Sequence, residues 1–320
     1  MVFETELNCH KEGEKRMLTG LNVAVIGGDA RQLEVIRRLS EHDANLFLIG
    51  FDQLEHGYTG SVKINSHNIS LEGMDAVILP VSGTGSEGQV EAVFSAEEIV
   101  LTREMVASTP EHCIFYSGIR TKYLEELMEK EKRKLVPILD RDDVAIYNSI
   151  PTVEGTIMLV IQHTDFTIHG SNIAVIGFGR TGMSVARTFA ALGANVKVGA
   201  RKQKDLARIT EMGMKPFHLS ELKDELSSID ICINTVPALV LSSDVLAAMP
   251  VHALIIDLAS KPGGTDFHYA EKRGMKAILA PGLPGIVAPR TAGQILANAL
   301  TILLTEQHQL ERSMDNGSER

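Results

Sequence analysis

The chain of 320 residues contains no tryptophan, only three cysteines and few aromatic residues, which make up 5% of the sequence. The cysteines are Cys9, Cys113 and Cys232, and their spacing fits neither a zinc site nor a redox motif, so no metal site is predicted. Cys113 and Cys232 lie within apolar runs, which is typical of buried thiols in a cytoplasmic protein. These absences exclude the disulfide-stabilised secreted scaffolds and the thiol-ligated metal proteins.

Long hydrophobic runs and an excess of positive charge are also lacking. No segment approaches the ~20 apolar residues of a membrane helix, and the charged N-terminus has no signal-peptide core. The net charge is −10, which disfavours nucleic acid and anionic membranes as partners, because both require clustered lysine and arginine. We therefore expect a cytoplasmic protein whose partner is a small molecule or another protein.

What the sequence does contain is an internal repeat. Residues 20–27 read Gly-Leu-Asn-Val-Ala-Val-Ile-Gly, and residues 170–177 read Gly-Ser-Asn-Ile-Ala-Val-Ile-Gly. Each half of the chain thus begins with an apolar, β-branched run typical of the central strand of a doubly wound parallel sheet. We predict an α/β protein of two Rossmann-like domains joined by a crossing helix. The predicted parts are a substrate domain at 17–150 completed by a helix at 290–305, an NADP-binding domain at 151–289, and polar extensions at 1–16 and 306–320.

A Gly-x-Gly-x-x-Gly turn joins the second of these strands to an amphipathic helix. In a βαβ unit the first glycine permits the tight turn, the second lets the backbone approach a pyrophosphate, and the third lets the helix pack on the strand. The free N–H groups at the start of the helix also favour phosphate. The alternative is a glycine-rich turn with a purely structural role. The predicted cofactor residues in this turn are Gly177, Phe178, Gly179, Arg180, Thr181 and Gly182.

The next strand ends at Arg201 and Lys202, where an NAD-preferring site would carry a carboxylate for the ribose hydroxyls. Two cations and no carboxylate suit the 2′-phosphate of NADP, because a guanidinium binds phosphate through two parallel hydrogen bonds. A solvated basic turn is the alternative. Later strands of this half end in loops on the same edge of the sheet, and these add Thr235, Val236, Pro237, Ala259 and Ser260 to the predicted cofactor site.

The first copy of the repeat differs from the second at the glycine turn. Asp29 stands where Gly179 stands in the second copy, and its carboxylate would repel a pyrophosphate but can cap a helix. The N-terminal half is therefore not expected to bind a second dinucleotide. Two of its later loops are rich in glycine and hydroxyl groups, which suits an anion, although a flexible loop without a ligand is the alternative. The predicted substrate residues in these loops are Ser82, Gly83, Thr84, Ser117, Gly118 and Arg120.

Pro151 and Glu154 are typical of the first turn of a helix, and we predict that this helix runs over residues 155–162 between the two domains. Its start would place Ser149, Thr152 and Glu154 at an interdomain cleft, which is a common location of substrate sites.

The second half resembles the NAD(P)-binding domain of the D-2-hydroxyacid dehydrogenase superfamily, through the glycine turn and the Asn-Thr-Val-Pro sequence at 234–237. The arginine and histidine that this superfamily uses on its substrate are missing, since Ser260–Lys261 and Ala280–Gly282 stand in their places. The resemblance implies the nucleotide domain but disfavours oxidation of a hydroxyacid.

A second resemblance covers nearly the whole chain. Residues 25–32, 148–155, 257–264 and 281–293 are similar to motifs of the family of dipicolinate synthase A-subunits. The resemblance implies an NADP-dependent oxidoreductase in the mother cell of a sporulating bacterium, which works with a flavoprotein-like B-subunit. The implied reaction converts a small cyclic dicarboxylate, 4-hydroxy-tetrahydrodipicolinate, through dihydrodipicolinate to dipicolinate.

For this reaction we predict a site richer in anchoring groups than in strong nucleophiles, because formation of the aromatic ring favours the oxidation. Glu154 is the candidate acid or base. Arg120 and Lys261 are the candidate cations for the two carboxylates of the substrate, and solvated surface positions are the alternative for both.

Two other functions stay open. A dehydrogenase of the shikimate or methylene-tetrahydrofolate type is also NADP-linked and has a similar Asn-Thr-x-Pro turn. Its lysine and aspartate pair would have to come from Lys63 or Lys122 with Asp75 or Asp143. The other alternative is a non-catalytic NADP-binding subunit whose partner performs the chemistry. A homo-oligomer is compatible with each of these functions.

Overall fold

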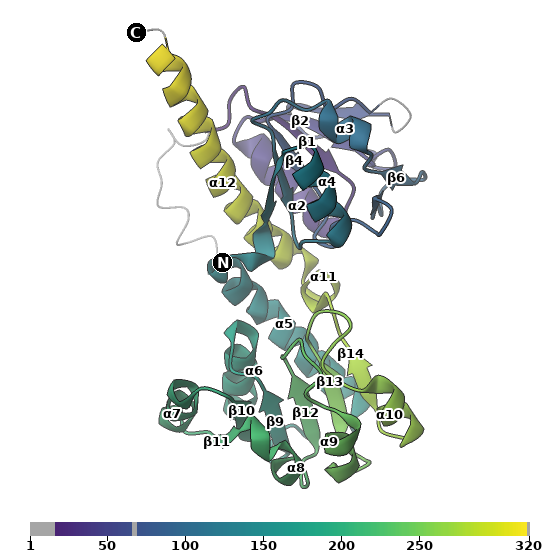
Figure 1. Ribbon diagram of the computed structural model, residues 1–320, viewed down its shortest axis with the longest axis vertical. Coiled ribbons are helices and arrows are strands. Elements are labelled where there is room, and N and C mark those ends of the chain that lie inside the picture. Colours follow the sequence, from purple (N-terminus) through teal and green to yellow (C-terminus); the bar gives the residue numbers. More distant parts are fainter. Residues whose placement is uncertain (1–16, 66–68, 319–320) are drawn as a thin grey trace. The chain divides into compact units, whose positions relative to one another are not determined.

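The computed structural model describes residues 17–65 and 69–318 (Figure 1). The extension predicted at 1–16 lies outside these residues. Two compact units are distinguished along the chain. Unit 1 combines Met1–Val144 with Pro289–Arg320, and unit 2 is Ala145–Ala288.

Unit 1 contains a six-stranded parallel sheet in the order β3-β2-β1-β4-β7-β8. The strand order reverses between β1 and β4, and ligands of doubly wound sheets bind at such a reversal. An antiparallel pair, β5 and β6, lies between β4 and β7 in the chain. The strands are β1 (Asn22–Ile26), β2 (Asn45–Ile49), β3 (Ser61–Ile64), β4 (Ala76–Ile78), β5 (Gln89–Val90), β6 (Ile99–Val100), β7 (Ile114–Ser117) and β8 (Lys134–Pro137), and the helices are α2 (Ala30–Glu41), α3 (Arg103–Ala107), α4 (Lys122–Lys130), η3 (Ile138–Asp140) and α12 (Pro289–Ser318).

Unit 2 repeats this topology with the strand order β11-β10-β9-β12-β13-β14, again fully parallel. The reversal here falls between β9 and β12. The strands are β9 (Asn172–Ile176), β10 (Asn195–Ala200), β11 (Lys215–His218), β12 (Ile231–Asn234), β13 (Leu254–Asp257) and β14 (Ala277–Leu279), and the helices are α5 (Asp142–His163), α6 (Arg180–Ala191), α7 (Gln203–Glu211), η4 (Leu219–Glu221), α8 (Leu222–Glu225), α9 (Ser243–Ala248), α10 (Phe267–Lys272) and α11 (Leu283–Val287).

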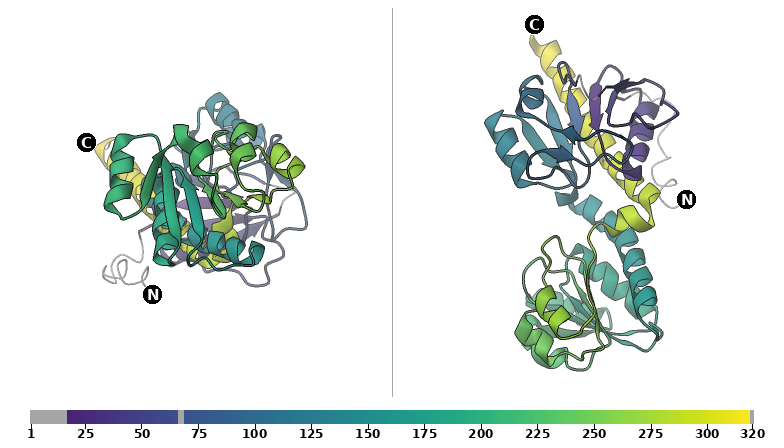
Figure 2. Two further views of the ribbon diagram at one scale, coloured as in Figure 1. Left: turned by 90° about the horizontal axis from the view of Figure 1, so that it is seen from below. Right: turned by 90° about the vertical axis from the view of Figure 1, so that its right-hand side faces the viewer.

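Each sheet is buried on both faces, as parallel sheets normally are. In β1, Val23 and Val25 belong to one apolar cluster, and Ala24 and Ile26 belong to another. Strand β9 divides its side chains between two clusters in the same way. Figure 2 shows helices on both sides of the sheets. The predicted fold class, two doubly wound parallel α/β sheets, is confirmed.

The repeat extends to the polar contacts at the amino edge of each sheet. A carboxylate oxygen of Asp75 accepts a hydrogen bond from the backbone N–H of Asn22 at 2.7 Å, and a carboxylate oxygen of Asp230 accepts one from Asn172 at 2.7 Å. These contacts tie the segment before the fourth strand to the first strand in both units. The two halves therefore share more of their construction than the apolar pattern that revealed the repeat.

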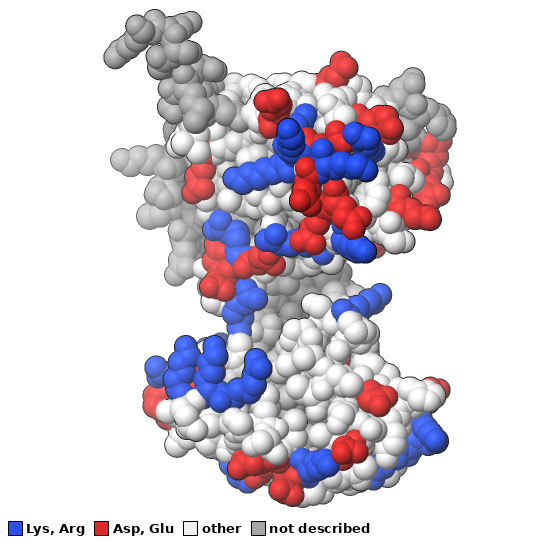
Figure 3. Space-filling model, viewed as in Figure 1, with Lys and Arg blue, Asp and Glu red and all other residues white. Residues whose placement is uncertain are grey.

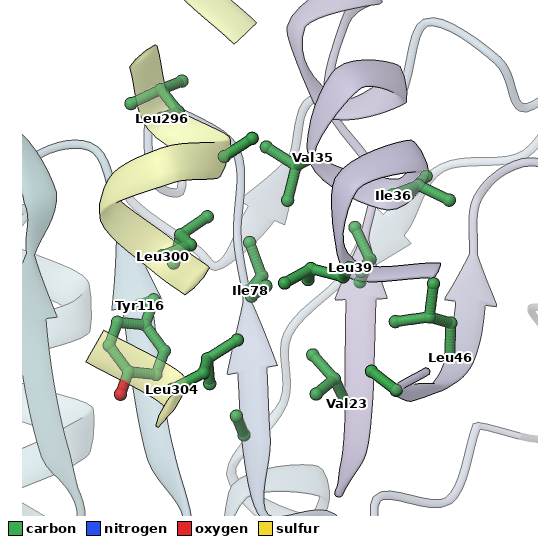
Figure 4. Packing of buried hydrophobic residues seen from close by; sticks show 14 of the residues in the cluster. Val23, Val35, Ile36, Leu39, Leu46, Ile78, Tyr116, Leu296, Leu300 and Leu304 are labelled. Carbon is green, nitrogen blue, oxygen red and sulfur yellow. The ribbon is translucent and has the colours of Figure 1, made fainter. Parts of the chain in front are cut away.

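Helix α12 follows unit 2 in the chain but belongs to the core of unit 1 (Figure 4). Its Leu296, Leu300 and Leu304 lie in the same apolar cluster as Val35 and Ile78.

The predicted end of this helix at residue 305 is wrong, because α12 continues to Ser318. Gln307 lies in the part of the helix beyond residue 305, and its side chain is buried. Its amide donates to the backbone oxygen of Asp75 at 3.0 Å, and its carbonyl accepts from the Tyr116 hydroxyl at 3.1 Å. The polar sequence after residue 305 therefore still contains a side chain that binds the sheet.

The predicted start of helix α5 is also wrong. The helix begins at Asp142, and Pro151 lies in its interior instead of its first turn. By length and composition α5 is the one helix in the described residues that could cross a membrane, but this is weak evidence. Val153 and Val160 of the helix are 4% and 0% exposed in the core of unit 2, so core packing accounts for the apolar composition.

Candidate nucleotide site

Unit 2 contains a pocket of about 500 Å³ at the carboxyl edge of its sheet, beside the reversal between β9 and β12. The pocket brings together the glycine turn, the end of β10 and the turn after β12. Predicted cofactor residues that line it are Gly177, Phe178, Gly179, Arg180, Thr181, Gly182, Arg201, Lys202, Thr235, Val236 and Pro237. Further residues line it that the sequence did not single out: Ala145, Ala200, Lys204, Asp205 and Leu219.

The three glycines of the turn have different surroundings, which fit a bound pyrophosphate. A Cβ atom on Gly177, whose φ is +99°, would lie 2.4 Å from Thr235 Oγ1. One on Gly182 would lie 2.2 Å from the backbone oxygen of Gly177, so the helix packs directly on the turn. Apart from its two chain neighbours, no residue comes within 4 Å of a Cβ built on Gly179, which leaves room for a ligand at the N-terminus of α6.

The far end of the pocket is basic. Arg201, Lys202 and Lys204 are exposed, and no hydrogen bond or ion pair occupies their side chains within residues 17–65 and 69–318. Lys202 also precedes helix α7, whose first turn receives no side-chain cap. Figure 3 shows Lys and Arg side chains gathered over this part of unit 2. Free cations beside an uncapped helix start form a favourable environment for a phosphate group. Asp205 is the one acidic residue among those that line the pocket.

The turn after β12 is held by the side chain of Asn234. Its carbonyl accepts from the backbone N–H of Val236 at 3.0 Å, and its amide donates to the carboxylate of Asp257 at 3.0 Å. Thr235 Oγ1 donates to the backbone oxygen of Ile176 at 2.9 Å. Ala259 and Ser260, also predicted for the cofactor, follow β13 and do not line the pocket.

Cys232 is fully buried on β12. Burial, followed by the nearby charge of Asp257, raises the pKa of its thiol, which therefore stays protonated. The prediction of a core thiol is consistent with this position.

In unit 1 the position that corresponds to the pocket of unit 2, at the reversal between β1 and β4, is occupied by side chains and backbone of unit 1. Asp29 caps α2 through the backbone N–H of Arg31 at 2.9 Å and also binds the Arg31 guanidinium at 2.7 Å. Burial raises the pKa of Asp29, but the hydrogen bonds from Arg31 outweigh this effect and hold the pKa below its usual value. A Cβ on Gly27 would lie 2.4 Å from the backbone oxygen of Glu91, and the backbone of Gly28 bonds to Glu91 and Val93. The segment around β5 thus covers the turn where a pyrophosphate would bind.

We expect each chain to bind one nicotinamide dinucleotide, because only the turn in unit 2 is open among the described residues. The variant Gly179→Asp copies Asp29 into the second repeat, and the space around Gly179 accommodates the side chain. This variant should lose all binding through charge repulsion with the pyrophosphate. Isothermal titration calorimetry measures both the stoichiometry of the wild-type chain and the binding of the variant. A stoichiometry of two per wild-type chain, or binding that persists in the variant, would contradict the assignment.

The predicted substrate loops of unit 1 lie side by side, but several of their groups already bind the protein. A Cβ on Gly118 would lie 2.3 Å from the backbone oxygen of Val81, and Ser117 is fully buried with its hydroxyl 3.4 Å from the Pro80 oxygen. The remaining side chains bind as follows: Ser82 donates to Glu91 at 2.8 Å, Thr84 Oγ1 lies 3.1 Å from Thr121 Oγ1 next to Gly83, and Arg120 donates to Asp140 at 3.1 Å. Ser82 and Arg120 are exposed, so their partners can be exchanged for a ligand.

The candidates on α5 differ in access. Ser149 is buried, with its hydroxyl 2.8 Å from that of Ser184 on α6, and Thr152 donates to the backbone oxygen of Asn148 at 2.8 Å. Glu154 is exposed and makes no hydrogen bond or ion pair within the described part of the chain. Lys261, the remaining candidate, is exposed in the loop after β13.

The lysine and aspartate pairs of the alternative dehydrogenases do not form. Lys63 donates to the backbone oxygen of Leu54, and Lys122 lies 3.7 Å from Glu126. The carboxylates are also engaged elsewhere: Asp75 binds Asn22 and His112, and Asp143 binds Arg141. No group of three His, Cys, Asp or Glu side chains within 17–65 and 69–318 is placed to hold a metal ion.

Comparisons with known proteins place the chain in a family. Residues 22–139 match the family model of the N-terminal domain of the dipicolinate synthase A-subunit. The A-subunit of dipicolinate synthase from Bacillus subtilis (strain 168) is 64% identical over 290 residues, which cover 91% of this chain and 98% of the relative. The chain belongs to the family of dipicolinate synthase A-subunits.

The solved structures agree with this membership. The crystal structure of the dipicolinate synthase A-subunit from Bacillus halodurans is 62% identical, with a TM-score of 0.88, and the match covers 90% of this chain and 99% of that one. Residues 153–317 match the family model of the alanine dehydrogenase/PNT C-terminal domain. An L-alanine dehydrogenase structure shares the fold at 14% identity, with a TM-score of 0.57, and the match covers 93% of this chain and 88% of that one. The second half is thus a dehydrogenase-type NAD(P)-binding domain.

Proposed function

We propose that this chain is the NADP-dependent subunit of a dipicolinate synthase, which acts with its B-subunit in the cytoplasm of a sporulating mother cell. The observation that carries the choice of NADP is the set of free cations at the end of the pocket, Arg201, Lys202 and Lys204. Family membership supports the role as the A-subunit, because the relatives bear that name.

We assign the pyrophosphate of NADP to the open backbone at Gly179 and the N-terminus of α6. The 2′-phosphate is assigned to Arg201 and its two lysine neighbours, since exposed guanidinium and ammonium groups bind phosphate through charge-assisted hydrogen bonds. When bound, the nicotinamide supplies a hydride acceptor. The protein positions the nucleotide and supplies the positive charges that bind its phosphates.

In the proposed reaction the substrate loses one water molecule and then two hydrogens. 4-Hydroxy-tetrahydrodipicolinate loses its hydroxyl and a ring proton to give dihydrodipicolinate. This compound then loses a hydride and a proton to give dipicolinate. Each proton needs an acceptor, and we propose Glu154 for this role because its carboxylate is exposed and has no partner among the described residues. Lys261, which is exposed in the same unit, is proposed to anchor a carboxylate of the substrate.

The test of this function is direct. The purified chain with the B-subunit, NADP and 4-hydroxy-tetrahydrodipicolinate should form dipicolinate while the absorbance of reduced nicotinamide rises. Shikimate in place of this substrate should give no rise in the absorbance of reduced nicotinamide. Product formation without any dependence on NADP would favour the non-catalytic role instead.

The variant Glu154→Gln should lower the rate of dipicolinate formation by about a hundredfold or more, the usual contribution of a general acid or base. NADP affinity should not change, because Glu154 does not line the pocket. Glu271→Gln, at an exposed glutamate of α10 in the same unit, is the control and should keep full activity. Full activity in Glu154→Gln would remove this residue from the mechanism.

A further inference from the structure

The carboxylate of Asp257 at the end of β13 is completely buried and carries a full set of hydrogen bonds. Its Oδ1 accepts from the Asn234 amide at 3.0 Å and from the backbone N–H of Ala259 at 3.1 Å. Its Oδ2 accepts from the backbone N–H of Gly264 at 2.8 Å and from Thr265 Oγ1 at 2.6 Å. Four acceptor positions are all that a carboxylate offers, so none remains for a substrate.

This buried carboxylate has no cationic partner among the described residues. No Lys, Arg or His within residues 17–65 and 69–318 forms an ion pair with Asp257. A buried carboxylate without a counter-ion is costly unless hydrogen-bond donors surround it, and here all four donors come from neighbouring loops. The carboxylate therefore holds these segments in place.

The donors belong to two segments, the end of β12 with its following turn and the loop after β13, and the first of these lines the pocket. Asn234 begins the turn whose Thr235, Val236 and Pro237 line the pocket. Ala259 and Gly264 bracket the loop that contains Ser260 and Lys261.

The same two loops also touch directly at Gly264. A Cβ on Gly264 would lie 2.4 Å from the backbone oxygen of Val236 and 2.5 Å from that of Ala238. The backbone oxygen of Gly264 accepts from the N–H groups of Val240 and Leu241 at 3.0 and 2.9 Å. The loops after β12 and β13 therefore form one packed body around the Asp257 carboxylate.

We propose that Asp257 is a positioning residue that couples the loop of Lys261 to the pocket turn at Val236 and thereby sets the nicotinamide end of the site. This inference rests on the proposed function, from which it takes NADP as the ligand of the pocket. The adenosine end, formed by Arg201, Lys202 and Lys204, lies at the end of β10 and the start of α7 and makes no contact with the carboxylate. The two ends of the pocket can therefore be tested separately.

The test compares two ligands in the full chain. NADPH reaches both ends of the site, whereas 2′,5′-ADP carries only the adenosine end. In Asp257→Asn, one oxygen is replaced by an NH2 group that cannot accept from two of the four donors. In either orientation of the amide, at least one of the lost donors belongs to the segment after β13, so the hold on this segment should weaken. We expect NADPH affinity to fall by about tenfold to a hundredfold, while affinity for 2′,5′-ADP stays within about twofold of wild type.

Thr265 provides variants with a smaller change in structure. Thr265→Val removes one donor at nearly constant shape and should reproduce the selective loss of NADPH affinity. Thr265→Ser keeps the hydroxyl and should retain wild-type affinity. Asp230→Asn, at the opposite edge of the same sheet, serves as the control for a general loss of stability. It should leave the ratio of the two affinities unchanged.

Hydrogen exchange gives a readout that needs no ligand. In Asp257→Asn, amides of residues 235–241 and 259–264 should exchange faster together, while those of 177–182 should not change. Equal affinity ratios and equal exchange in wild type, Asp257→Asn and Thr265→Val would overturn the proposal, and so would the same loss in Asp230→Asn. If wild type with the B-subunit forms no dipicolinate while the exchange result holds, the proposed function fails and the coupling of the loops stands.

Discussion

Replacing Arg201 by Asp is expected to lower the affinity for NADP by about tenfold to a hundredfold, through the loss of a charge-assisted phosphate contact and the added repulsion. Affinity for NAD should fall much less or rise, because a carboxylate at the end of this strand can accept hydrogen bonds from the ribose hydroxyls. The preference for NADP over NAD should therefore weaken or reverse. Titration of the reduced nucleotides by their fluorescence measures both constants.

The control for this change is Arg208→Asp. Arg208 lies on helix α7, which begins two residues after Arg201; it is 62% exposed and pairs with Glu211 at 2.9 Å, but it does not line the pocket. The substitution makes the same change in charge away from the site, so it should leave the ratio of NADP to NAD affinity close to the wild-type value. An unchanged ratio in Arg201→Asp would refute the assignment of the 2′-phosphate.

Leu300→Ala should destabilise unit 1 by about 2 to 5 kcal/mol, the usual cost of removing a buried leucine side chain from a packed core. Leu300 is 1% exposed and lies in the cluster between α12 and the sheet (Figure 4). Calorimetry should show the transition of unit 1 at a lower temperature. Circular dichroism is the appropriate second measurement, because the chain has no tryptophan for fluorescence.

Ile302→Ala on the same helix is the matched control. Ile302 is 44% exposed, so the loss of its side chain should change the free energy of unfolding by less than about 1 kcal/mol. Equal effects of the two substitutions would mean that α12 does not complete the core of unit 1.

The sequence predicted the two central strands because their apolar runs repeat and end in glycine. It misplaced helix α5 because proline is most often found in the first turn of a helix, and here Pro151 lies in the interior. It also ended α12 too early, since the hydrogen bonds of Gln307 to Tyr116 and Asp75 join positions far apart in the chain. Local preferences carry no information about such contacts.

The site also combines features that local sequence patterns predict with features that depend on contacts between distant positions. The glycine turn and Arg201 are local features of a βαβ unit, and the sequence places them together. Lys204 was missed because its position beside the pocket depends on how α7 packs. Asp257 stands out in the sequence only as part of a family motif, because its four donors come from two loops that meet after folding.

The arrangement of α12 has a consequence for synthesis of the chain on the ribosome. Unit 2 is a continuous segment and can fold as soon as it emerges, but unit 1 lacks Leu296, Leu300 and Leu304 until α12 has been synthesised after unit 2. At roughly 5 to 20 residues per second, the unfinished first unit waits on the order of ten seconds with part of its core exposed. Unit 1 is thus begun before unit 2 but completed after it, and during this interval its exposed apolar core makes it a target for chaperones.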